Sequence, residues 1–189
     1  TQKVVDRARA AKVGFDKHAD ITTGPVIDGR AWTRLKGLVD DAVAGGATLL
    51  AGGERPTGMN AGHFLAPTVL AGVTETMAVY REETFGPIVS IVPFDDNTDL
   101  LRMANDCEEG GLTAYVFTRD LARAEHFSAH LRYGEIQING VKYDIDLPHG
   151  GIGQSGVGHD CSALALHDYL VQKRITRALD TTTFGGLNP

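Results

Sequence analysis

The chain has 189 residues, 42% of them hydrophobic and 22% charged, which is typical of a globular protein of one domain, or of one large and one small lobe. The net charge of −6 and the scattered Lys and Arg argue against a nucleic-acid surface, and the apolar runs are too short to span a membrane. Because no signal-peptide pattern opens the chain and two cysteines are too few for a disulfide framework, we expect a cytoplasmic protein.

The first third of the chain predicts two helices and two short strands. Residues 1–13 resemble the end of an amphipathic helix, and a chain that opens inside a helix is expected to be a piece of a longer protein. Apolar residues recur at helical spacing from Trp32 to Val43, and Gly45-Gly46 ends that helix. Strands are expected at 48–51 and 64–70.

Strands and helices then alternate from Gly86 to Asn139. The continuous apolar run 88–94 is typical of a strand buried on both faces, and Asp96-Asn97-Thr98 offers N-caps to the helix that follows. The next expected elements are a strand at 112–117, a helix at 120–132 and a strand at 135–139. This alternation predicts an α/β fold, a parallel sheet of right-handed βαβ units flanked by helices. A helix at 161–171 and a strand at 173–179 are expected to follow, before a polar, glycine-rich tail.

A glycine-rich stretch between Pro148 and Asp160 contains the letters G-x-G-x-x-G at 151–156. In a dinucleotide-binding motif, a strand precedes these glycines and a helix opens on them. Here neither is expected, because Asp-Ile-Asp-Leu-Pro-His precedes them and the helical pattern begins only near Cys161. The stretch therefore predicts a loop whose backbone approaches another segment closely or adopts positive φ.

Two segments carry residues suited to ligand binding. In the turn at 81–87, a carboxylate of Glu82 or Glu83 could accept hydrogen bonds from paired ribose hydroxyls while Phe85 packs on a flat ring, although a solvated acidic turn is the alternative. His149 lies between a proline and two glycines and could donate to an anionic or hydroxylated ligand, although a surface histidine is equally compatible.

Other reactive side chains give weaker hypotheses. His126 and His130 share one helix face, but no third ligand is placed, so no metal site is expected. Cys161 follows His159 and Asp160, the residue types of a thiol hydrolase. Adjacent residues cannot all converge on one reacting atom, and we expect a structural role for this cysteine.

Several short motifs in a fixed order resemble the C-terminal part of the aldehyde dehydrogenase superfamily. They are VG at 13–14, TGPVI at 23–27, HFLAPTVL at 63–70, EETFGP at 82–87, ND at 105–106, AYVFT at 114–118 and PHGGIGQSGVG at 148–158. The resemblance implies that 1–172 form the C-terminal portion of the catalytic domain, and that 173–189 form a terminal strand and tail used in oligomer contacts. It also implies a homo-oligomer, a dimer or a tetramer, for the full-length enzyme.

The reaction implied by the resemblance is the oxidation of an aldehyde to a carboxylic acid with NAD⁺ or NADP⁺. In this family the nucleophilic cysteine, the general-base glutamate and the nucleotide-binding domain precede the segment, so the chain alone is expected to be inactive. Glu83 matches the glutamate that holds the nicotinamide ribose, Phe85 the aromatic residue beside the nicotinamide, and Arg34 a lysine near the adenosine ribose. Asp160 stands where a family glutamate serves in proton relay or interface pairing.

Departures from the family pattern indicate the substrate. His149 replaces a phenylalanine of the substrate tunnel and resembles the lactaldehyde dehydrogenase branch, which implies a small hydroxy- or carboxy-bearing aldehyde such as lactaldehyde, glycolaldehyde or a semialdehyde. Gly153 replaces a lysine, and His159-Asp160 replaces Arg-Glu, which weakens any family ion pairing at this loop. The alternative to an enzyme is a truncated, non-catalytic assembly module that acts through its terminal strand.

Overall fold

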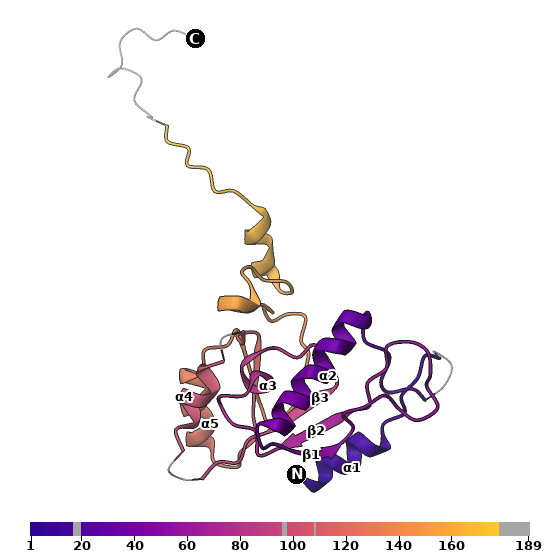
Figure 1. Ribbon diagram of the computed structural model, residues 1–189. Helices are drawn as coiled ribbons and strands as arrows, with labels where there is room; N and C mark the ends of the chain where they lie inside the picture. Colours follow the sequence, from indigo (N-terminus) through magenta and orange to yellow (C-terminus); the bar gives the residue numbers. More distant parts are fainter. Residues whose placement is uncertain (17–19, 96–97, 108, 178–189) are drawn as a thin grey trace, which may run out of the picture.

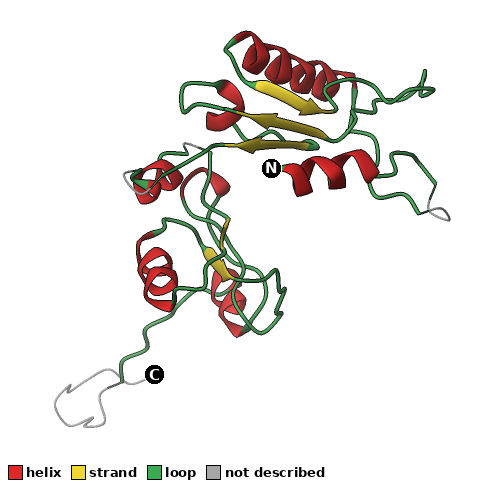
Figure 2. Cartoon of the chain, turned by 90° about the horizontal axis from the view of Figure 1, so that it is seen from below, coloured by secondary structure: helices red, strands yellow, loops and turns green. Residues whose placement is uncertain are grey.

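The computed structural model describes residues 1–16, 20–95, 98–107 and 109–177. Three strands near the N-terminus form one sheet in the order β1-β2-β3 (Figures 1 and 2). β1 (Thr48–Ala51) is antiparallel to β2 (Thr68–Ala71), and β2 is parallel to β3 (Ile88–Ile91). The expected strands are thus confirmed, while the antiparallel edge was not foreseen.

Three helices accompany this sheet, and their bounds follow the apolar spacing. α1 (Gln2–Ala10) contacts β1 and β2, whereas α2 (Gly29–Ala44) contacts α3 (Ala78–Arg81). The N-cap of α2 is Asp28, whose carboxylate accepts the backbone N–H of Ala31, and this bond satisfies a donor that the helix itself leaves unpaired.

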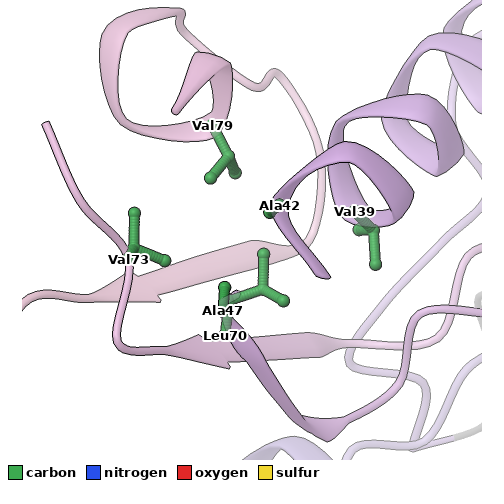
Figure 3. Packing of buried hydrophobic residues seen from close by; sticks show 6 residues of the cluster. All are labelled: Val39, Ala42, Ala47, Leu70, Val73 and Val79. Carbon is green, nitrogen blue, oxygen red and sulfur yellow. The ribbon is translucent and has the colours of Figure 1, made fainter. Parts of the chain in front are cut away.

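A cluster of small aliphatic side chains holds α2 and α3 against the sheet (Figure 3). Val39 and Ala42 come from α2, Leu70 from β2 and Val79 from α3, and all four are nearly inaccessible to solvent. Burying such side chains is worth roughly 1.5–3 kcal/mol for each valine or leucine. This core fixes α2 relative to the turn that joins α3 to β3.

The second half of the chain forms a separate βαβ unit. β4 (Thr113–Val116) and β5 (Glu135–Ile138) are parallel and in register, and α5 (Leu121–His130) connects them. α4 (Leu100–Asn105) precedes this unit, and Asn105 binds the end of α5 through the backbone of His130 and Arg132. The predicted βαβ arrangement is confirmed here.

The prediction of one continuous parallel sheet is wrong within the described residues, because β3 pairs with β2 and β4 pairs with β5, and no ladder joins β3 to β4. β3 ends at Ile91, two residues before Pro93, which has no N–H to donate to a ladder. Nor is the strand buried on both faces, since Val89 is 47% exposed.

The start of α4 also differs from expectation. α4 is capped by Asp99, whose carboxylate accepts the N–H of Arg102, whereas the Thr98 hydroxyl binds Asp95. The other two expected caps, Asp96 and Asn97, lie outside the described residues.

The helix expected at 161–171 is instead the 3-10 helix η2 (Ala163–Tyr169). After η2 the chain runs out from the rest of the molecule (Figure 1). The strand expected at 173–179 is not formed over 173–177, because an edge strand needs a pairing partner and these residues are exposed; 178 and 179 lie outside the described residues. Among the described helices, we find none whose length and hydropathy would suit a membrane span.

Candidate functional site

The turn at 82–87 presents an aromatic ring and a carboxylate at the start of β3. Phe85 has a φ of +50°, which is uncommon for a non-glycine residue, and 82% of its surface is exposed. Gly86 packs so closely on Leu35 of α2 that a side chain there would overlap the leucine. Strained, exposed residues of this kind concentrate at ligand sites.

The side chain of Arg34, on α2, binds this turn. Its guanidinium donates to the carbonyl oxygens of Thr84 at 3.0 Å and Glu83 at 2.9 Å, and to the carboxylate of Glu82 at 3.1 Å. Because the Arg34 and Glu82 side chains are 43% and 45% exposed, their ion pair contributes little. The bonds to the backbone restrain the turn, and they use a planar fork that lysine could not supply.

A second charged residue, Glu109, binds the backbone of Glu83. The backbone N–H of Glu83 donates to the Glu109 carboxylate at 2.6 Å, so both main-chain groups of Glu83 are bound by side chains. Among the described residues, by contrast, no bond is made to the carboxylate of Glu83 itself. Glu109 was not predicted from the sequence, because it lies between the family-like motifs at 105–106 and 114–118 and belongs to neither.

The structure therefore brings together Arg34, Glu83 and Phe85, the three residues predicted to contact the cofactor. The contacts of Arg34 are made with the turn itself, which gives it a second role that the sequence did not suggest. The arrangement presents a carboxylate, which accepts hydrogen bonds only, beside an exposed aromatic ring. Such a pair can bind two vicinal hydroxyls and a flat ring.

The glycine-rich stretch folds back on itself and joins His149 to Asp160. The two residues exchange backbone hydrogen bonds of 3.0 and 2.8 Å as an isolated antiparallel bridge. Side chains directly opposite in such a pair lie on the same face. Accordingly, Nδ1 of His149 lies 2.8 Å from a carboxylate oxygen of Asp160.

The glycines in this stretch allow the chain to reverse direction and to pack closely against other backbone segments. Gly153, Gly156 and Gly158 have φ of +63°, +113° and +89°, which residues with side chains rarely adopt. A side chain at Gly150 would overlap the carbonyl of Gly158, and one at Gly134 would overlap the carbonyl of Gly150. The predicted close-packed loop is confirmed.

The dinucleotide alternative fails on local structure. No strand leads directly into the glycines, and the stretch contains a single 3-10 turn, η1 (Gly153–Ser155), where the motif would require the start of an α-helix. Without a helix N-terminus, aligned backbone N–H groups are missing for a pyrophosphate.

The surroundings of His149 are partly aromatic and open. Its ring packs edge-to-face on Tyr143, with centroids 6.1 Å apart, and it lines a hollow of about 480 Å³ together with the glycine loop, His159 and Asp168. The Tyr143 hydroxyl lies 2.8 Å from Sγ of Cys161, and this hydrogen bond raises the pKa of the phenol above its usual value.

Cys161 does not lie at a helix N-terminus, which is a position that lowers the pKa of a thiol. η2 begins two residues later and is capped by Ser162, and the Cys161 thiol contacts the hydroxyl of Tyr143 rather than an imidazole. Asp160, the carboxylate of the thiol-hydrolase hypothesis, is bonded to His149. The structure thus gives the hypothesis no nucleophile–base pair.

His126 and His130 stack on the exposed face of α5 with centroids 4.5 Å apart, and Nδ1 of His130 binds the carbonyl of His126. In the described part of the chain, no three His, Cys, Asp or Glu side chains gather in a way that could hold a metal ion.

The two predicted sites are connected by the short segment at 109–111. Glu109 binds the Glu83 turn, and the carbonyl of Gly111 accepts the N–H of Ile152 in the glycine loop at 3.0 Å. A hollow of about 280 Å³ beside this segment is lined by Cys107, Gly110 and Ile152.

Comparisons with known proteins agree with the motifs. The model described as "Aldehyde dehydrogenase family" matches residues 1–175. The chain is 38% identical over 174 residues to the non-phosphorylating aspartate-semialdehyde dehydrogenase of Halomonas elongata, covering 91% of this chain and 34% of the relative. It is 37% identical to the glutarate-semialdehyde dehydrogenase of Pseudomonas putida (89% and 34% covered) and to the betaine aldehyde dehydrogenase of Mesorhizobium japonicum (92% and 36% covered).

Solved structures show the same relationship. A succinate-semialdehyde dehydrogenase from Burkholderia pseudomallei matches with a TM-score of 0.83 and 37% identity, over 90% of this chain and 35% of that one. A betaine aldehyde dehydrogenase from Staphylococcus aureus in complex with NAD⁺ matches with a TM-score of 0.83 and 33% identity, over 95% and 37%. The chain spans about a third of the length of the relatives it matches. From the family match over nearly its whole length, we conclude that the chain belongs to the aldehyde dehydrogenase family.

Proposed function

We propose that this chain supplies the nicotinamide-ribose contact and part of the substrate entrance of an NAD(P)⁺-dependent aldehyde dehydrogenase. One observation carries the proposal: the backbone of Glu83 is held on both sides, by Arg34 and Glu109, while its carboxylate and the ring of Phe85 face outward. A restrained hydrogen-bond acceptor binds a ligand more tightly than a mobile one, because less conformational entropy is lost on binding.

The residues present fit a nicotinamide cofactor. The bound cofactor would supply the hydride acceptor for aldehyde oxidation. Glu83 would accept hydrogen bonds from the two ribose hydroxyls, and Phe85 would pack beside the nicotinamide ring. The names of structural neighbours in complex with NAD⁺ support this role, whereas the choice between NAD⁺ and NADP⁺ is left to residues that contact the rest of the cofactor.

For the substrate we propose a small hydroxy- or carboxy-bearing aldehyde, such as lactaldehyde or a semialdehyde. His149 can donate to a carboxylate when protonated and can exchange a hydrogen bond with a hydroxyl when neutral. Several relatives are named for semialdehydes, which carry a carboxylate. A protonated imidazole would disfavour the cationic betaine aldehyde for which other relatives are named.

The thiolate and the general base would come from another part of the full-length protein. The Cys161 thiol is bound to Tyr143 and has no neighbouring base, and Cys107 is flanked by carboxylates in the sequence. We therefore propose that the chain alone is inactive. From the family membership we also propose that the full-length enzyme is a cytoplasmic homo-oligomer.

Activity of the full-length protein tests the proposal. Purified enzyme with NAD⁺ or NADP⁺ and succinate semialdehyde should produce an absorbance rise at the wavelength of the reduced cofactor, together with the carboxylic acid, and the 189-residue chain should produce neither. Absence of aldehyde-dependent reduction with both cofactors over a panel of hydroxy, carboxy and alkyl aldehydes would remove the proposal.

A non-catalytic assembly module is the second candidate, and the extended, exposed segment after η2 favours it. Val171 and Ile175 are 96% and 80% exposed there, as expected of a segment that pairs with another chain. The reading frame upstream of Thr1 separates the two functions. An in-frame cysteine at family-like spacing supports the enzyme, whereas a start codon at Thr1 supports the module.

Changing Arg34 to methionine should raise KM for the cofactor about 10-fold, because the turn loses its bonds to the guanidinium while α2 keeps its apolar contacts. The matched control is Arg30→Met on the same helix, whose partner Asp28 is local; it should change KM less than about twofold. Steady-state KM for NAD(P)⁺ at saturating aldehyde is the measurement. Equal effects of the two variants would show that Arg34 does not support the cofactor site.

A further inference from the structure

We infer that Asp160 is the positioning residue of His149, so that the carboxylate fixes which imidazole nitrogen faces the substrate. The inference rests on the proposed substrate role of His149. It replaces the proton-relay role that the family resemblance implied for Asp160.

The first step is the backbone. The antiparallel bridge between His149 and Asp160 is made by main-chain groups alone, so it does not require the carboxylate. The bridge places the two side chains on one face, where Oδ1 of Asp160 lies 2.8 Å from Nδ1 of His149. Removing the carboxylate should therefore release the ring without opening the loop.

The second step is the proton. A carboxylate only accepts hydrogen bonds, so Nδ1 of His149 must carry a hydrogen in this contact. Nε2 is then the nitrogen left for a ligand. It accepts from a substrate hydroxyl when the ring is neutral, and it donates to a substrate carboxylate when the ring is protonated. Without Asp160, both tautomers and several ring orientations become accessible.

The third step is the setting. The His149 side chain is 33% exposed, and it lines a hollow of about 480 Å³ into which a small aldehyde fits. Tyr143 packs edge-to-face on the ring, and among the described contacts the hydrogen bond of the ring is made by Nδ1 and none by Nε2. Since Asp160 is 72% exposed, we expect the pair to change affinity severalfold rather than by orders of magnitude.

The chain offers a matched control in the segment that leads into His149. Asp146 is an exposed carboxylate that does not line the hollow, and among the described contacts its side chain makes no bond to His149. Asp146→Ala removes a carboxylate of equal charge and leaves the His149–Asp160 contact intact. The conservative variant Asp160→Asn keeps an oxygen that can accept from Nδ1.

The test uses the full-length enzyme with succinate semialdehyde and propanal as paired substrates. Asp160→Ala should raise KM for succinate semialdehyde about fivefold, while kcat and the KM for propanal stay within about twofold. Asp160→Asn should recover most of the loss, and Asp146→Ala should leave both KM values within about twofold. In a His149→Phe background, Asp160→Ala should add nothing further, because its effect acts through the histidine.

Equal KM changes for the two substrates, or a full additional loss in the His149→Phe background, would overturn the inference. A separate readout keeps it distinct from the proposed substrate role. If His149→Phe itself leaves selectivity unchanged, the substrate role fails, and crystal structures of the full-length variants decide the positioning role. A His149 ring displaced in Asp160→Ala but not in Asp146→Ala supports it, and an unmoved ring in Asp160→Ala refutes it.

Discussion

Glu83→Ala should lower kcat/KM for the cofactor by about 100-fold, since hydrogen bonds to a charged group are worth about 1.5–3 kcal/mol each and the ribose offers two hydroxyls. The loss should fall on the cofactor rather than on folding. The bonds of Glu83 to Arg34 and Glu109 are made by its backbone, and alanine keeps them.

The neighbouring Glu82 provides the control. Its carboxylate forms a half-exposed ion pair with Arg34, so Glu82→Ala should cost less than about threefold. Initial rates at varied NAD(P)⁺ and saturating aldehyde measure both variants, and thermal unfolding verifies that they remain folded. Similar losses for Glu82→Ala and Glu83→Ala would mean that the turn, and not the Glu83 carboxylate, matters.

His149→Phe should change which aldehydes the full-length enzyme prefers. Losing a charge-assisted hydrogen bond should raise KM for succinate semialdehyde roughly 10-fold to 100-fold, while KM for propanal stays within about threefold because phenylalanine is apolar and of similar shape. Betaine aldehyde should bind the variant better, since an imidazole that can take up a positive charge has been replaced by an uncharged ring. Paired steady-state kinetics on the three substrates measure the shift.

The matched substitution at the other histidine of this loop is His159→Phe. The backbone N–H of His159 donates to Asp168 at 2.7 Å, and this bond survives the change. The His159 ring lies 3.9 Å from the same carboxylate in a half-exposed contact that contributes little, so this change should leave selectivity within about twofold. Equal rises in KM for succinate semialdehyde and propanal in His149→Phe would contradict the proposed recognition of a polar group.

Local patterns in the sequence predicted the elements well. Helical spacing located α2, and the helix expected at 120–132 is formed as α5, where the Asp120 carboxylate accepts the N–H of Arg123 as a cap. Strand β1 was placed at its observed bounds, Thr48–Ala51. These features depend on neighbours in the chain, so periodicity and capping rules suffice for them.

Features set by distant contacts were not predictable. Whether β3 and β4 belong to one sheet or to two depends on the strand with which each of them pairs. The apolar pattern of the sequence is compatible with both arrangements. The contact of Glu109 with Glu83 spans 26 residues and crosses between two loops. The hydrogen bond that His149 donates to Asp160 requires the chain to reverse direction at the positive-φ glycines. Sequence spacing alone cannot specify this reversal.

A crystal structure of the full-length protein with NAD⁺ would decide whether Glu83 holds the ribose of a nicotinamide cofactor. We expect both ribose hydroxyls within about 3 Å of the Glu83 carboxylate, with the turn still bound by Arg34 and Glu109. A bound cofactor whose ribose lies away from Glu83, with that carboxylate facing solvent, would contradict it.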